Sequence, residues 1–126
     1  MKKLLIVEDE VSARKAMTEK FTRDGFEVET AANGEEGLTQ ATKFQPDLIL
    51  LDIIMPRMDG LTMLQKLRAE NEWGKNVPVI ILTNMTLDDK EKMKLVGSLG
   101  HEEYLIKADW KLADVAIKIK QTLKME

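Results

Sequence analysis

Short apolar runs alternate with longer amphipathic stretches along this chain. The runs are rich in β-branched residues and lie at Leu4–Val7, Val28–Ala31, Leu48–Leu51, Val79–Leu82 and Tyr104–Ile106. Three of them are almost entirely apolar, as expected for strands that are buried on both faces of a parallel sheet. The pattern therefore predicts five strands, with helices in the stretches that follow them.

The stretches between the runs carry apolar residues at helical spacing. Three faces are predicted, formed by Val11, Met17 and Phe21, by Leu61, Leu64 and Leu67, and by Leu112, Val115, Ala116, Ile119 and Leu123. Thr86 and Asp89 form a capping-box pattern that predicts a helix around residues 87–98, and Asp109 is the expected N-cap of the last helix. The resulting (βα)₅ order requires a parallel sheet with helices on both faces, which is the doubly wound α/β class.

Composition narrows the function classes. The chain has 126 residues, an ordinary length for one domain, and no cysteine, which excludes disulfides, thiolate zinc sites and thiol catalysis. A net charge of −3 gives no sign of a nucleic-acid partner. The apolar run after Met1-Lys2-Lys3 is too short for a signal peptide or a membrane span. We expect one cytoplasmic domain over residues 1–126, without direct contact to nucleic acid or membrane.

Reactive side chains follow four of the five predicted strands. Glu8 and Asp9 come after the first strand, Asp52 after the third, Thr83 ends the fourth and Lys107 follows the fifth. In an open α/β sheet, ligands bind beyond the carboxyl ends of the strands, near the point where the strand order reverses. We therefore expect these side chains to share one rim of the sheet.

Three carboxylates on one rim repel one another. Two of them about 4 Å apart cost roughly 4 kcal/mol at an effective dielectric constant near 20. A cation relieves this repulsion, and oxygen-only ligands favour a hard cation such as Mg²⁺. Lys107 and Thr83 suit phosphate oxygens, and an aspartate can act as a nucleophile that forms an aspartyl phosphate. Phosphoryl transfer needs little beyond positioning and charge neutralisation.

At these residues the chain resembles the receiver domains of response regulators in two-component signalling, over essentially its whole length. The resemblance rests on Glu8-Asp9, the segment Asp52-Ile53-Ile54-Met55-Pro56-Arg57-Met58-Asp59-Gly60, Thr83, Tyr104 and Lys107, in this order and spacing. It implies a flavodoxin-like (CheY-like) five-stranded sheet of order 2-1-3-4-5.

The resemblance also implies the roles of the site residues. Asp52 would be the phosphoacceptor, and Thr83 and Lys107 would contact the phosphoryl group. Glu8, Asp9, Asp52 and the backbone carbonyl of Ile54 would hold Mg²⁺ as the cofactor.

A further implication is a switch with defined partners. Tyr104 would turn inward when Thr83 moves toward the phosphate, although static core packing is an alternative role for this tyrosine. A sensor histidine kinase, a phosphotransfer protein or a small donor such as acetyl phosphate would supply the phosphoryl group. The fourth helix, fifth strand and fifth helix would signal to an effector that the sequence does not identify. A homodimer formed on phosphorylation is compatible with this scheme.

Three positions depart from the family pattern. Glu8 stands where Asp is more usual, and Asn84 stands where a small residue commonly follows the hydroxyl, which would narrow access to the site. Ala108 replaces the usual proline after Lys107. Because a non-proline cis bond costs about 2.5–4 kcal/mol, we expect Lys107–Ala108 to be trans.

Other functions fit the residues less well. A Mg²⁺-dependent phosphatase with an aspartyl-phosphate intermediate needs a second acid close after its nucleophile, where this chain has Ile54. A nucleotide or flavin binder needs hydrogen-bond donors for phosphate groups on the rim, which is acidic in this chain. The sequence also contains neither G-x-G-x-x-G nor a P-loop. A pseudo-receiver, which is never phosphorylated, would not need residues suited to phosphorylation at all five site positions, as this chain has. We therefore expect a signalling module and not a turnover enzyme.

Overall fold

The computed structural model describes residues 1–85 and 90–125. Its strands are β1 (Lys3–Val7), β2 (Glu27–Ala31), β3 (Leu48–Leu51), β4 (Val79–Thr83) and β5 (Glu103–Ile106). They form one parallel sheet in the order β2-β1-β3-β4-β5, with Val7 beside Ala31 on one flank and Leu51 on the other. The fold class and the strand order expected from the sequence are both confirmed.

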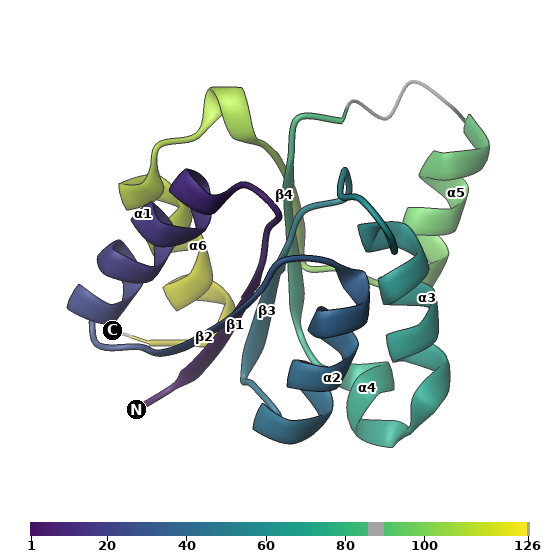
Figure 1. The fold of residues 1–126 in the computed structure, drawn as a ribbon, viewed down its shortest axis with the longest axis horizontal. Helices are drawn as coiled ribbons and strands as arrows, with labels where there is room; N and C mark the ends of the chain where they lie inside the picture. Colours follow the sequence, from purple (N-terminus) through teal and green to yellow (C-terminus); the bar gives the residue numbers. More distant parts are fainter. Residues whose placement is uncertain (86–89, 126) are drawn as a thin grey trace.

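Helices cover both faces of this sheet (Figure 1). They are α1 (Val11–Arg23), α2 (Gly34–Phe44), α3 (Gly60–Glu70), α4 (Glu72–Asn76), α5 (Lys90–Leu99) and α6 (Leu112–Thr122), with a 3₁₀ turn, η1 (Lys107–Asp109). Helices α1 and α6 lie on one face, and α2, α3, α4 and α5 lie on the other. No described helix is both long enough and apolar enough to cross a membrane.

The core explains why the central strands are almost entirely apolar. Successive side chains of a strand point to opposite faces, so Leu4 and Ile6 pack under α1 and α6 while Leu5 and Val7 pack under the other helices. Every residue of β3 and β4 is buried. At the sheet edge, β2 alternates between exposed and partly buried positions up to Ala31.

The short helix α4 was not predicted from the sequence. Five residues are too few for an apolar period, so its start depends on Asn71, whose side chain accepts a hydrogen bond from Gly74 N–H at 2.7 Å. Arg68 from α3 then donates to the carbonyls of Gly74 at 2.8 Å and Val77 at 2.7 Å. Polar contacts rather than hydrophobic periodicity hold this helix.

Two local predictions were wrong. Val11 is 67% exposed, whereas Met17 and Phe21 are buried, because at about 3.6 residues per turn Val11 lies on a different side of α1. Asp109 is not an N-cap; it belongs to η1, and α6 begins after Lys111 without a side-chain cap. The capping box of Thr86 and Asp89 lies outside the described residues.

Candidate functional site

Two buried acids extend the sheet at the carboxyl ends of adjacent strands. Glu8 follows β1, and its N–H donates to the Ala31 carbonyl at 3.0 Å; Asp52 follows β3, and its N–H donates to the Val7 carbonyl at 3.0 Å. Glu8 is 1% and Asp52 6% exposed. Because their backbones continue the hydrogen bonding of the sheet, their carboxylates are fixed at the same rim.

Asp9 completes an acidic cluster with these two residues. One carboxylate oxygen from each of Glu8, Asp9 and Asp52 lies within 4.8 Å of the others. Asp9 is the most exposed of the three. The structure therefore brings together all three acids that the sequence placed on this rim, as an oxygen-only donor set of the kind that suits Mg²⁺.

The ammonium group of Lys107 lies between two of these acids. Its Nζ donates to Glu8 Oε1 and, at 2.9 Å, to Asp52 Oδ2. Burial raises the pKa of the Glu8 carboxyl, and the ion pair with Lys107 opposes that rise. Burial alone would lower the pKa of Lys107, but its bonds to both acids outweigh burial and raise that pKa. Lys107 thus partly neutralises the acidic cluster.

The segment after Asp52 packs tightly against its backbone. Ile54 N–H donates to Asp52 Oδ1 at 3.2 Å, which orients the carboxylate. Asp59 caps α3 by accepting from Thr62 N–H at 2.8 Å. A Cβ on Gly60 would lie 2.2 Å from the Asp52 carbonyl oxygen, so only glycine fits there. The side chain of Ile54 is 56% exposed, and the role of its carbonyl as a metal ligand stays a prediction.

Thr83 and Tyr104 meet at one residue, Met85. The fully buried Thr83 ends β4, and its Oγ1 accepts from Met85 N–H at 3.3 Å. Tyr104 lies on β5 and donates from its hydroxyl to the Met85 carbonyl at 2.6 Å. Burial raises the pKa of Tyr104, and the negative charge of Asp52 raises it further. The two residues expected to form a switch are thus linked through one backbone position.

Two of the departures from the family pattern are bonded to each other. Ala108 N–H donates to Asn84 Oδ1 at 3.0 Å, a bond that a proline at position 108 could not make. No described peptide bond is cis, so the trans Lys107–Ala108 bond is confirmed. The sequence showed both residues but gave no sign that they pair.

Sequence reasoning missed Arg14 altogether. Its guanidinium donates to the backbone carbonyls of Glu8 at 2.8 Å and Asp9 at 3.3 Å, just behind the acidic cluster. An arginine in the first turn of a helix looks like a solvated surface residue. A backbone acceptor leaves no mark in the sequence, so no pattern could have found this contact.

Comparison with known proteins places this arrangement in a family. The model of the response regulator receiver domain matches residues 4–118. Sporulation initiation phosphotransferase F of Bacillus subtilis (strain 168) is 39% identical over 100 residues, covering 79% of this chain and 78% of the relative. The probable transcriptional regulator ycf27 of Cyanophora paradoxa is 39% identical over 106 residues, covering 84% of this chain but 42% of the relative.

Solved structures agree with the sequence comparison. Vibrio cholerae chemotaxis protein CheY4 superposes with a TM-score of 0.85 at 30% identity, covering 96% of this chain and 98% of that one. A CheY-like receiver domain protein from Methanospirillum hungatei JF-1 gives a TM-score of 0.87 at 27% identity, covering 98% and 94%. The chain spans about two fifths of the length of the first curated relatives it matches. On this evidence, the chain belongs to the response regulator receiver domain family of two-component systems.

Proposed function

We propose that this chain is a phosphorylation-controlled switch in which Asp52 accepts the phosphoryl group, and that residues 1–126 act as one receiver domain. The observation that carries the proposal is the convergence of Glu8, Asp9 and Asp52 with the Lys107 ammonium at one rim of the sheet. Membership of the receiver family supports it.

Asp52 is well held for attack on phosphorus. Its Oδ1 accepts from Ile54 N–H and its Oδ2 from Lys107, so the carboxylate is oriented before a donor arrives. A carboxylate oxygen forms the new bond to phosphorus while the bond from phosphorus to the donor atom breaks. The donor, an imidazole nitrogen of a histidine kinase or the acyl oxygen of acetyl phosphate, keeps the electron pair of the broken bond.

The residues present fit Mg²⁺. Glu8, Asp9 and Asp52, with the backbone carbonyl of Ile54, would hold the ion through oxygen alone. When bound, Mg²⁺ would neutralise negative charge on the acids and on the incoming phosphoryl oxygens. Lys107 makes the same contribution from the protein side, and its long stem lets the ammonium shift from Glu8 toward a phosphoryl oxygen.

The switch would work through Met85. A phosphoryl group on Asp52 would attract the Thr83 hydroxyl, which would then leave Met85 N–H. The same residue holds Tyr104 through its carbonyl, so its movement would free the tyrosine to turn inward. Shifting a two-state domain from about 1:99 to 99:1 takes roughly 5.5 kcal/mol, to which the Thr83 and Lys107 contacts contribute. The signalling surface would be α5, β5 and α6, the fourth helix, fifth strand and fifth helix of the sequence prediction.

The partners follow from this chemistry. A sensor histidine kinase or phosphotransfer protein would load Asp52, and the relationship to a sporulation initiation phosphotransferase supports a place in a phosphorelay. A downstream effector would bind the α5-β5-α6 surface, and phosphorylation would favour a homodimer through it. The relatives called transcriptional regulators are much longer than this chain, which matches 42% of their length. We therefore propose no direct binding of nucleic acid by this chain.

Turnover chemistry is the weaker alternative. One relative is a protein-glutamate methylesterase/protein-glutamine glutaminase from Archaeoglobus fulgidus, but the matched region is 32% of its length. A phosphatase would need an acid near Asp52 to protonate a leaving group, and the position two residues on is the apolar, exposed Ile54. A pseudo-receiver, which is never phosphorylated, would not require the cluster of Glu8, Asp9 and Asp52. We therefore propose a signalling domain that takes part in its own phosphorylation and dephosphorylation.

Incubation with acetyl phosphate tests the proposal. The parent should be labelled only when Mg²⁺ is present, as seen by intact mass and Phos-tag electrophoresis. Asp52→Asn should abolish labelling because it removes the nucleophile but preserves the shape. Asp114→Asn, on the exposed side of α6, is the matched control and should be labelled like the parent. Failure of the parent to label, or equal labelling of Asp52→Asn, contradicts the assignment.

A further inference from the structure

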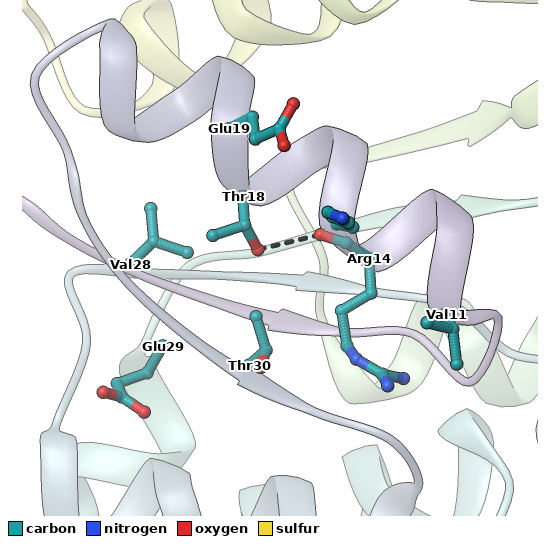
Figure 2. Close-up of a pocket in the computed structure, with 8 residues that line it drawn as sticks. Val11, Arg14, Thr18, Glu19, Val28, Glu29 and Thr30 are labelled. Carbon is teal, nitrogen blue, oxygen red and sulfur yellow. Dashed lines mark hydrogen bonds between the residues drawn. The ribbon is translucent and has the colours of Figure 1, made fainter.

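A groove of about 390 Å³ runs between α1 and the edge strand β2 (Figure 2). Arg14 extends into it from α1, and its guanidinium points away from Thr18 toward the end of the groove where Val11 lies. Glu19 and Glu29 also line the groove. Within the described residues, Arg14 nevertheless forms an ion pair with neither of them.

The guanidinium instead bonds the backbone of the acidic loop. Arg14 Nη1 donates to the carbonyl of Glu8 at 2.8 Å and to that of Asp9 at 3.3 Å. These are the two residues of the β1–α1 loop whose carboxylates join the acidic cluster. Both bonds are charge-assisted, and such bonds are roughly twice as strong as neutral ones. One side chain therefore restrains both peptide units.

Apart from the bond from Glu8 N–H to the Ala31 carbonyl, the loop has few other restraints that leave its carboxylates free. Glu10 is the N-cap of α1 but makes no side-chain cap bond. Glu10 N–H donates to Glu8 Oε2 at 3.1 Å, and this bond occupies a carboxylate oxygen that could otherwise bind a cation. Lys107 likewise occupies Glu8 Oε1. Arg14 is different because it places a positive charge behind the acids and uses only carbonyl oxygens.

We propose that Arg14 is a positioning residue for divalent-cation binding, which holds Glu8 and Asp9 in place without competing for their carboxylates. This inference rests on the proposed Mg²⁺ site and adds a residue to it. Outer residues that orient metal ligands typically change metal affinity by about tenfold or more when they are replaced. Arg14 should therefore govern how tightly Mg²⁺ binds rather than how fast the loaded site reacts.

The test is a Mg²⁺ titration of the full chain, followed through the amide resonances of Glu8, Asp9 and Ile54. Arg14→Met keeps the apolar stem and removes the donors, and should weaken Mg²⁺ binding about tenfold. Arg14→Lys keeps one charged donor group and should recover most of that loss. Lys15→Met removes the same charge from the same groove, where Lys15 is exposed, and should bind Mg²⁺ like the parent.

Labelling by acetyl phosphate adds a second readout. Arg14→Met should need about tenfold more Mg²⁺ for half-maximal labelling and should reach the parent rate at saturation. Equal Mg²⁺ affinity in Arg14→Met and Lys15→Met overturns the inference, as does a fall in thermal stability of Arg14→Met without a change in affinity. A parent that binds no Mg²⁺ overturns the proposed metal site as well, so the two failures are distinguishable.

Discussion

Tyr104 donates a hydrogen bond from its phenolic hydroxyl to the carbonyl oxygen of Met85 at 2.6 Å. Because the N–H of Met85 donates to Thr83 Oγ1, this contact joins strand β5 to the end of β4 beside the acidic cluster. Tyr104 is also the single tyrosine of the chain, so its state can be followed by absorbance without interference from another phenol.

The ultraviolet titration of Tyr104 should have its midpoint above the usual value of about 10. Burial is the main cause of the raised pKa and the charge of Asp52 adds to it, so Asp52→Asn should lower the midpoint part of the way. The folded state keeps this proton to higher pH than the unfolded state. The stabilisation from the hydroxyl is therefore complete below the unfolded pKa and is lost as the pH rises through the folded pKa. A midpoint equal to that of the denatured chain would refute this prediction.

Thr83→Ala should separate phosphorylation from its response. Asp52 keeps its orienting bonds, so labelling by acetyl phosphate should continue, but the hydroxyl that links the site to Met85 is gone. Loss of this buried bond should also cost about 0.5–1.5 kcal/mol of unfolding free energy. Chemical shifts of the Tyr104 ring before and after labelling check the uncoupling, and Thr83→Ser should restore it. If labelling changes the chemical shifts of the Tyr104 ring equally in Thr83→Ala and the parent, Thr83 does not couple phosphorylation to Tyr104.

Two glycine-to-alanine changes should move stability in opposite directions. At Gly60, an added Cβ would lie 2.2 Å from the Asp52 carbonyl oxygen, so backbone must shift and Gly60→Ala should destabilise by roughly 1–3 kcal/mol. At Gly97, within α5, nothing lies within 4 Å of the added Cβ. Gly97→Ala should stabilise by up to about 1 kcal/mol because alanine has the higher helix propensity. Denaturant unfolding measures both, and a neutral Gly60→Ala would contradict the close packing behind Asp52.

Millimolar Mg²⁺ should raise the melting temperature of the parent. Binding to the folded state alone adds about 2.7 kcal/mol at a hundred times the dissociation constant. Asp9→Ala should weaken the response by removing one of the three acids, while leaving the metal-free protein no less stable because repulsion within the cluster falls. Glu10→Gln alters the neighbouring exposed acid and serves as the control. An unchanged parent melting curve would count against the metal site.

The central strands β3 and β4 could be predicted from the sequence because burial on two faces leaves a signature in every residue. The runs at Leu48–Leu51 and Val79–Leu82 lie within a residue of β3 and β4. The start of α6 after Lys111 and the existence of α4 could not be predicted in this way. Both depend on local backbone paths and polar contacts, such as the bond from Gly74 N–H to Asn71, which hydrophobic periodicity does not report.

The sequence by itself determined which reactive residues share the site, because the residues that follow parallel strands all lie at the same edge of the sheet. That rule placed Glu8, Asp52 and Lys107 together, although Glu8 and Lys107 lie 99 positions apart. Only the tertiary structure decided which atoms pair, because a long side chain can reach several acceptors. Ala108 N–H meets Asn84, and Arg14 selects two carbonyls over nearby carboxylates. Apart from proline, every residue carries the same backbone donor and acceptor, so their partners are set by the folded path of the chain and not by residue type.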